Sequence, residues 1–273
     1  MKYKLIKQWI KSFYWSLHRI PPIRLLRRAK MSRGRLLSSG KIRGTPIVRY
    51  YWKEYLEQHQ KDIRGRGLEI GTTTTIRNFG GQALSTADAI DLTAHSPEVT
   101  VVADLSRANA IPDDCYDSFV NQFTMHVIYN VEAALYHSIR ILKPGGVLLI
   151  NFSCLDYYFP TGLDMGTGKP LYLYHSFTPI QVENLMRRIG LTTEDYQLQV
   201  YGNLFTRIAY QMNMSAEEMT KSERDTQDAH YPLLICGRVV KPAIWQTNAP
   251  IYRKPWHPQT EAAIWNAVKE ERV

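Results

Sequence analysis

A glycine and an aspartate in the first half of the chain have the spacing of a nucleotide-type cofactor site. Gly71 follows the short apolar run GLEI, and Asp91 ends a second run, AIDL, 20 residues later. A glycine after a buried strand lets a ligand approach the backbone closely, and an acid about 20 residues further on can accept hydrogen bonds from ribose hydroxyls. The pair predicts a site for an adenosine-containing cofactor, although such residues are also common in inert loops.

Further apolar runs alternate with helical segments and would position this site. Residues 131–142 have one apolar helical face and end at KPGG, and Thr178-Pro179 begins a helix that runs to Arg188. Strands that alternate with helices predict a mostly parallel sheet. We expect an antiparallel pair to close the sheet. The expected strands after the first two are TVVADL, YDSFVNQF, GVLLINFS, residues 196–201 and residues 232–239.

In order and spacing, the segments GLEIG, AIDL, ADLSRANAIPDDCYDSFV and HVIYNVEAALYHSIRILKPGG resemble the motifs of class I S-adenosylmethionine-dependent methyltransferases, especially the type 11 group. The resemblance covers residues 64–153. It implies an α/β, Rossmann-like fold, S-adenosyl-L-methionine as the cofactor, and methyl transfer as the reaction. Residues 46–71 also look like a subgroup associated with bacterial glycan synthesis, so we expect O-methylation of a sugar, a glycan or another small hydroxyl acceptor.

The resemblance also implies roles for individual residues. The wall and floor of the cofactor site would be formed by Glu69 and Gly71, the ribose would be held at Asp91, and the adenine would be recognised by Asp104 with Leu105. A turn cap before Ser106 is the alternative role for Asp104. The full expected cofactor-binding set is Glu69, Gly71, Thr73, Asp91, Leu92, Asp104, Leu105 and Gln122.

The turn after the first expected strand departs from the family pattern. The family usually has GxGxG here, whereas this chain has Gly71 followed by four threonines. Threonines at positions 73 and 75 adopt positive φ only at a cost, and their branched side chains crowd an approaching methionine moiety. Their hydroxyls could instead bind the carboxylate of the cofactor. The segment from Gly71 to Ala89 is short, so we expect a truncated first helix.

Methyl transfer to a hydroxyl requires a base that removes the proton of the acceptor. His126 follows the expected fourth strand and is the candidate catalytic base, with an ordinary packing histidine as the alternative. Candidate substrate-binding residues are Tyr157, Tyr158 and His175, of which the tyrosines could stack against a sugar ring. The cysteines and histidines are not clustered, so we expect no metal site and a reducing compartment.

Charge divides the chain of 273 residues into an arm and a body. Residues 1–50 contain 14 of the 34 Lys and Arg residues and no acidic residue, and the remainder is mildly acidic. We expect a basic N-terminal arm at residues 1–45, a methyltransferase-like domain at 46–240, and a C-terminal tail at 241–273 with a short helix.

The arm carries apolar residues at helical spacing among lysines, which is typical of an amphipathic helix. It lacks the roughly 20 consecutive apolar residues that span a bilayer. An anionic membrane surface could bind residues 1–35, and docking on the domain or on a second subunit is equally compatible. We expect a cytoplasmic protein, with the inner face of the membrane as a further location. The alternatives to a glycan methyltransferase are a degenerate binding protein with this fold and an RNA methyltransferase that uses the arm.

Overall fold

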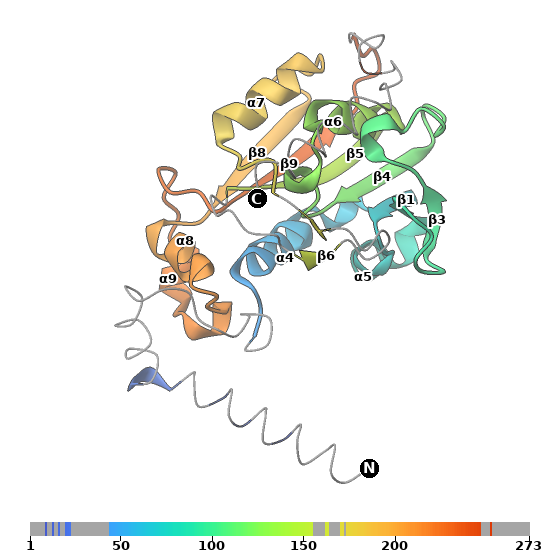
Figure 1. Ribbon diagram of the computed structural model, residues 1–273. Helices are drawn as coiled ribbons and strands as arrows, with labels where there is room; N and C mark the ends of the chain where they lie inside the picture. Colours follow the sequence, from blue (N-terminus) through green and yellow to red (C-terminus); the bar gives the residue numbers. More distant parts are fainter. Residues whose placement is uncertain are drawn as a thin grey trace, which may run out of the picture.

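A seven-stranded sheet with helices on both faces forms the centre of the computed structural model (Figure 1). The structure describes residues 44–154, 173–246, the strand pair at 162–163 and 170–171, and residues 9, 13, 16, 20–22 and 252. Its strands are β1 (Gly65–Ile70), β2 (Leu84–Asp91), β3 (Val99–Val102), β4 (Tyr116–Asn121), β5 (Leu142–Ser153), β6 (Gly162–Leu163), β7 (Pro170–Leu171), β8 (Tyr196–Tyr201) and β9 (Leu234–Val240).

The strand order is β3-β2-β1-β4-β5-β9-β8. Neighbouring strands from β3 to β5 are parallel, and β9 is antiparallel to both β5 and β8. The expected parallel sheet with an antiparallel closing pair is therefore confirmed, and this is the strand order of the class I methyltransferase fold. Chain order reverses between β1 and β4, which is the position where open α/β sheets bind ligands.

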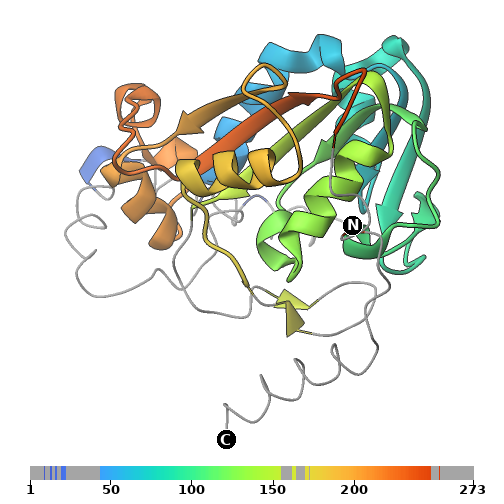
Figure 2. The same cartoon turned by 90° about the horizontal axis from the view of Figure 1, so that it is seen from above.

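Helices cover the two faces of the sheet in separate groups, as Figure 2 shows from above. The face with α4 and α5 buries a cluster that includes Val120 and Leu149, while the face with α6 and α7 buries Phe119 and Ile150. These residues alternate along β4 and β5 because successive strand side chains point to opposite faces. The helices are α4 (Ile47–His59), α5 (Thr74–Gly80), α6 (Val131–Arg140), α7 (Pro179–Arg188), α8 (Leu204–Gln211) and α9 (Lys221–Asp225), with 3-10 turns η2 (Gln60–Asp62), η3 (Gly81–Ala83), η4 (Leu105–Arg107), η5 (Met125–Val127) and η6 (Ala216–Glu218).

Side-chain caps mark the start of two helices, of which α7 begins at the predicted Thr178-Pro179 signal. The side chain of Thr178 accepts a hydrogen bond from the Gln181 amide, and Pro179 takes the first helical position of α7. Asn130 caps α6 in the same way through the amide of Ala133. The first helix after β1, α5, has only seven residues, which confirms the expected truncation.

The connection between β2 and β3 contains no helix. Parallel neighbours usually need a crossover of a dozen or more residues. Here residues 92–98 suffice because β3 begins beside the carboxyl end of β2, with Val99 opposite Ala89. This short segment therefore remains at the carboxyl edge, beside the end of β2. It places Glu98 close to the turn that follows β1.

Several expectations lie outside the described residues. They include most of the arm, the aromatic pair Tyr157 and Tyr158, and the terminal helix of the tail. The described part of the tail contacts the domain, since the indole of Trp245 donates to the Ile189 carbonyl and the Tyr252 hydroxyl donates to Glu132. Across the described residues, no helix is long and apolar enough to cross a membrane.

Candidate functional site at the carboxyl edge of the sheet

The turn after β1 and the end of β2 are in direct contact. Gly71 has φ +72°, a conformation that glycine adopts without steric cost. A Cβ atom on Gly71 would lie 3.2 Å from Oδ2 of Asp91. Oδ1 of Asp91 accepts a hydrogen bond from the Leu92 amide at 2.6 Å, and Oδ2 lies 3.6 Å from Nδ1 of His95. The structure thus brings Gly71 and Asp91 together at one edge, as the sequence predicts.

The carboxylate of Glu69 is buried, and both of its oxygens accept hydrogen bonds from the protein. Its Oε2 accepts hydrogen bonds from the backbone amides of Thr75 and Ile76 at 2.8 and 3.0 Å. Its Oε1 accepts one from the Gln122 side chain at 2.8 Å. Glu69 is 0% exposed, and burial raises the pKa of its carboxyl group. In this structure Glu69 anchors the start of α5, and direct contact with a cofactor stays a prediction.

Gln122 connects three elements at the point where chain order reverses. Its amide nitrogen donates to Glu69 and to the hydroxyl of Thr75, while its carbonyl oxygen accepts from the Trp52 indole at 2.8 Å. The result is a chain of hydrogen bonds from α4 through β4 to β1 and α5. Gln122 therefore fixes the spacing between the two central strands, beside any ligand that binds there.

The threonines of the turn bind a carboxylate that belongs to the protein itself. Oε2 of Glu98 accepts hydrogen bonds from the Thr73 amide at 2.9 Å, from the Thr72 hydroxyl at 2.7 Å and from the Thr73 hydroxyl at 3.3 Å. These bonds, with the amide of Thr73 first among them, hold the pKa of Glu98 below its usual value. Arg77 adds a positive charge nearby, with its Nε 2.9 Å from the Thr73 hydroxyl.

The expected adenine-binding residues have structural roles in the described chain. Asp104 accepts hydrogen bonds from the amide and the hydroxyl of Ser106, so it caps the turn η4. Leu105 is 5% exposed and belongs to the core between the sheet and α6. Leu92, in contrast, is 48% exposed beside Asp91 and offers an apolar surface at the carboxyl edge. The roles of all three in cofactor binding stay predictions.

His126 lies in η5, just after β4, with one ring nitrogen unpartnered. Its Nδ1 atom is buried and has no hydrogen-bond partner in the described parts of the chain, although the residue as a whole keeps partial exposure. Burial, with a smaller contribution from His175, lowers the pKa of His126 to about 4. The imidazole is therefore neutral at physiological pH and can accept a hydrogen bond, while its lowered pKa makes it a weaker base than an exposed histidine.

Two asparagines near His126 also carry unsatisfied buried atoms. Asn121 ends β4 and Asn151 lies near the end of β5, and neither Oδ1 of Asn121 nor Nδ2 of Asn151 has a partner among the residues described. The other amide atom of Asn151, Oδ1, accepts from the Phe123 amide at 2.8 Å. Phe123 has φ +52°, which is a strained conformation for a bulky residue. Strained backbone conformations of this kind occur most often at functional sites.

The segment before α7 brings His175 to His126. The Tyr174 and His175 amides both donate to the carbonyl of His126, at 2.8 and 3.3 Å. The His175 ring is bound through Nε2 to the carbonyl of Tyr129 at 2.9 Å. His175 therefore borders the same end of β4 as the candidate base, and its contact with a substrate stays a prediction.

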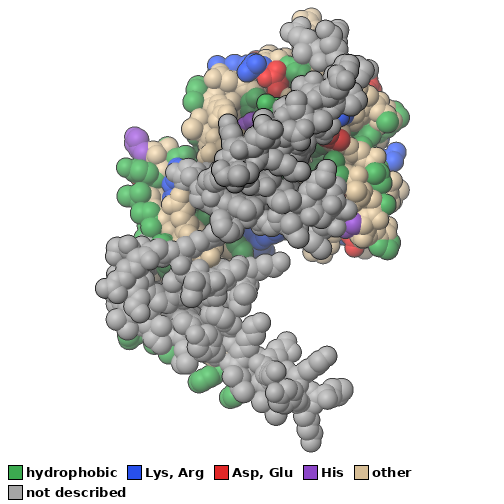
Figure 3. All heavy atoms as spheres, in the orientation of Figure 1, with side chains coloured by type: hydrophobic (Ala, Val, Ile, Leu, Met, Phe, Trp, Pro, Cys, Tyr) green, Lys and Arg blue, Asp and Glu red, His purple; other side chains and the backbone are tan. Residues whose placement is uncertain are grey.

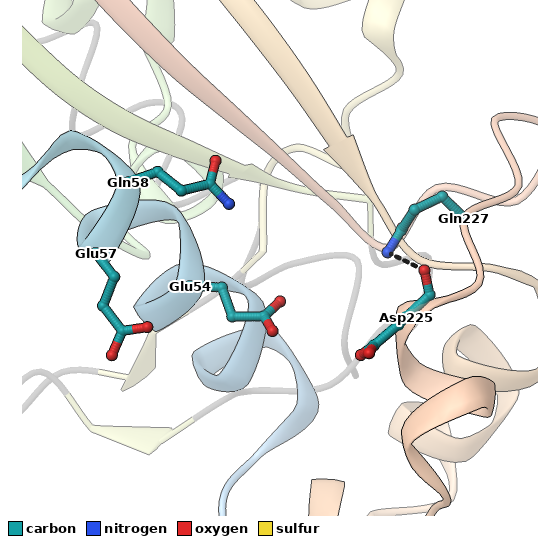
Figure 4. Close-up of a pocket in the computed structure, with 5 residues that line it drawn as sticks. All are labelled: Glu54, Glu57, Gln58, Asp225 and Gln227. Carbon is teal, nitrogen blue, oxygen red and sulfur yellow. Dashed lines mark hydrogen bonds between the residues drawn. The ribbon is translucent and has the colours of Figure 1, made fainter.

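A separate polar opening lies between α4 and α9 (Figure 4). Its volume is about 480 Å³, and Glu54 and Asp225 extend towards each other across it. Asp225 already binds Lys221 and the Tyr50 hydroxyl. Within the described ranges, no group of three His, Cys, Asp or Glu side chains could hold a metal ion.

The described residues fit one half of S-adenosylmethionine better than the other. Asp91 keeps an oxygen for a ribose hydroxyl, and Gly71 permits close approach. The methionine half meets a turn whose Thr72 and Thr73 donors are already bound to Glu98. Sequence reasoning missed Glu98, His95 and Asn151. Only eight positions separate Asp91 from Val99, which is too short for a helix and two turns. This short connection is the sequence feature that could have indicated that Glu98 stays near the end of β2.

Comparison with solved structures finds distant similarity to methyltransferases. Solved structures that resemble the chain include the DhpI–SAH complex (15% identity, 73% of this chain and 88% of that chain, TM-score 0.45). A second is a methyltransferase from Mesorhizobium loti (13% identity, 68% of this chain and 96% of that chain, TM-score 0.45). A third is the 1,6-didemethyltoxoflavin-N1-methyltransferase of Burkholderia thailandensis (14% identity, 69% of this chain and 76% of that chain, TM-score 0.42).

No curated protein matches the chain. Residues 80–150 match the model of a family described as a methyltransferase domain. This range extends from the end of α5 into β5 and includes Asp91, Asp104, Gln122 and His126. Taken with the strand order of the sheet, the match shows that residues 80–150 resemble a methyltransferase domain.

Proposed function

We propose that the protein transfers the methyl group of S-adenosylmethionine to a hydroxyl of a sugar, a glycan or another small acceptor. The observation that carries this proposal is the buried, unpartnered Nδ1 of His126 at the end of β4. A neutral imidazole can accept the hydroxyl proton as the oxygen attacks the methyl carbon. Asn121 and Asn151 offer polar atoms at the same edge that could orient the acceptor.

The reaction needs positioning more than it needs additional chemistry. S-adenosylmethionine supplies an activated methyl group, and displacement at its carbon requires the acceptor oxygen in line with the breaking bond. In this proposal Asp91 and Gly71 hold the adenosine, Gln122 keeps β1 and β4 in register, and His126 faces the acceptor. Leu92 would cover one side of the nucleoside.

The test has a binding part and a transfer part. Calorimetric titration with S-adenosylmethionine should give saturable binding, and the labelled methyl group should appear on one member of a panel of nucleotide sugars and oligosaccharides. His126→Gln should lower transfer by about 100-fold and leave cofactor affinity unchanged. Equal transfer by the variant would exclude His126 as the base, and transfer to small phenols alone would exclude a sugar acceptor.

A degenerate binding protein is the second candidate, and the occupied threonine turn favours it. In that case neither S-adenosylmethionine nor its adenosine fragment would bind. An RNA methyltransferase is a third candidate, supported by the basic arm. It predicts RNA binding that weakens steeply with salt and is lost after deletion of residues 1–43.

The arm supports a further proposal about location. Trp9 and Phe13 lie four residues apart, their rings stack at 5.7 Å, and they are 68% and 55% exposed. Figure 3 shows hydrophobic side chains of the described arm residues on the molecular surface. Exposed aromatic residues among lysines fit an anionic membrane surface. The protein should sediment with vesicles that contain phosphatidylserine at low salt and dissociate at high salt. Absence of sedimentation at low salt would contradict this location.

A further inference from the structure

Glu98 occupies a position on the threonine turn that suits a ligand carboxylate. One oxygen of Glu98 accepts three hydrogen bonds there, from one backbone amide and two hydroxyls. The hydroxyl of Thr72 also lies 2.8 Å from that of Thr74, and Arg77 contacts Thr73. Several donors and a guanidinium group around one oxygen form a favourable setting for a carboxylate.

The methionine half of S-adenosylmethionine ends in a carboxylate, which is the same chemical group. Thr73 is itself an expected cofactor residue, but its amide and hydroxyl are both committed to Glu98 in this structure. The two carboxylates cannot use the same donors at once. Either the cofactor leaves this turn unused or Glu98 must move away.

Glu98 is able to move away. Its side chain is exposed, so water can replace the hydrogen bonds that it loses. The segment from residue 92 to 98 contains no helix and is held by turn hydrogen bonds, from the His95 amide to the Thr93 carbonyl at 2.9 Å and from the Glu98 amide to the Ser96 hydroxyl at 3.2 Å. The same segment passes Asp91, where Nδ1 of His95 is 3.6 Å from Oδ2.

We propose that Glu98 is an internal competitor that mimics the cofactor carboxylate and must leave the Thr72–Thr73 turn before S-adenosylmethionine binds. Glu98 thereby sets cofactor affinity and occupies the turn in the unliganded protein. This inference rests on the proposed function, since it assumes that S-adenosylmethionine binds at the carboxyl edge. It adds a residue that determines how strongly the amino-acid half of the cofactor is held.

Two ligands distinguish the competition from a general effect on the site. S-adenosylmethionine carries the carboxylate, whereas 5′-methylthioadenosine has the same nucleoside and sulfur but no amino-acid part. Calorimetric titrations of the full chain would compare the wild type with Glu98→Ala and Glu98→Gln. Glu194→Gln, an exposed change in the loop before β8, is the matched control.

Glu98→Ala should bind S-adenosylmethionine about five- to tenfold more tightly, because hydrogen bonds to a charged group are no longer broken first. Glu98→Gln should show a smaller gain. Affinity for 5′-methylthioadenosine should stay within about twofold in every variant, which also reports that the site is folded.

The outcomes separate the two proposals. Unchanged or weaker binding of S-adenosylmethionine by Glu98→Ala, with 5′-methylthioadenosine still bound, would overturn the role of Glu98 alone. An equal gain for both ligands would also overturn the competition, because the carboxylate would then not matter. If the wild type and Glu98→Ala bind neither ligand, the proposed methyltransferase function fails. Binding of S-adenosylmethionine only after removal of Glu98 would support the competition and would count against methyl transfer by the unmodified chain.

Discussion

The two halves of the carboxyl edge differ in how their polar groups are satisfied. At the ends of β1 and β2, Glu69 and Glu98 each accept three hydrogen bonds from the protein. At the ends of β4 and β5, buried atoms of His126, Asn121 and Asn151 have no partner in the described chain. Buried polar groups are usually hydrogen-bonded. The unpartnered atoms of the second half are therefore candidates for hydrogen bonds to a ligand.

This difference separates polar groups that stabilise the fold from polar groups that remain able to bind a ligand. The first half uses carboxylates of the protein to fix a short helix and a glycine-poor turn. The second half retains a neutral imidazole and two amide groups. Substitution of Glu69 in the first half should accordingly affect stability, whereas substitutions in the second half should affect ligand chemistry or pH response.

The largest effect is expected for Glu69→Ala. The change leaves the amides of Thr75, Ile76 and Gln122 without their buried acceptor, at roughly 1–3 kcal/mol for each donor, so stability should fall by about 3 kcal/mol or more. Urea unfolding of the full chain measures the loss. Glu57→Ala, an exposed change in α4, should remain within about 0.5 kcal/mol of the wild type. A loss below about 1 kcal/mol for Glu69→Ala would show that these bonds contribute little.

The second effect is a pH dependence that His126 should confer. Its pKa is about 4 in the folded chain and 6.5 in the reference state, so the unfolded chain binds more protons between these values. Stability should therefore fall as pH decreases from 6.5 to about 4, with a slope of up to about 1.4 kcal/mol per pH unit.

Comparison with His126→Gln isolates this contribution. The stability difference between the wild type and the variant should change through the same pH window and become constant above pH 6.5. His230→Gln is the control, because the His230 side chain is 90% exposed. A difference that is constant from pH 4 to 8 would mean that His126 titrates alike in both states, and that its ring is not held neutral by burial.

The sequence predicts the order of strands and helices because each element carries its own local signal. The apolar runs all overlap observed strands, and Thr178-Pro179 is the observed start of α7, but α6 ends at Arg140 and the KPGG segment lies inside β5 instead of between the helix and that strand. Gly71 and Asp91 also meet as expected, since carboxyl ends of neighbouring parallel strands share one edge. These features depend on periodicity and on fixed turn geometry, which a single sequence contains.

The hydrogen-bond partners at the site were not predictable in the same way. Glu98 reaches Thr73 across 25 positions only because the segment after β2 lacks a helix and turns back over the edge. The resemblance implies that Glu69 forms a wall of the cofactor site, and its hydrogen bonds with Gln122 and the Thr75 amide in α5 do not follow from that role. Such pairings depend on the path of a loop and on burial, and neither property follows from residue type.

The smallest expected effect concerns Asp91. It tests whether, within the first half, Asp91 and Glu98 act on different parts of the cofactor. If Asp91 holds the ribose while Glu98 competes with the amino-acid part, Asp91→Ala should weaken S-adenosylmethionine and 5′-methylthioadenosine equally, by about tenfold each. Asp195→Ala is a suitable control, because Asp195 also caps a backbone amide, that of Thr192, but lies at the opposite edge of the sheet. Calorimetry should show no change for this control. A loss for S-adenosylmethionine alone would place Asp91 at the amino-acid half, and would mean that the ribose is held elsewhere along the edge.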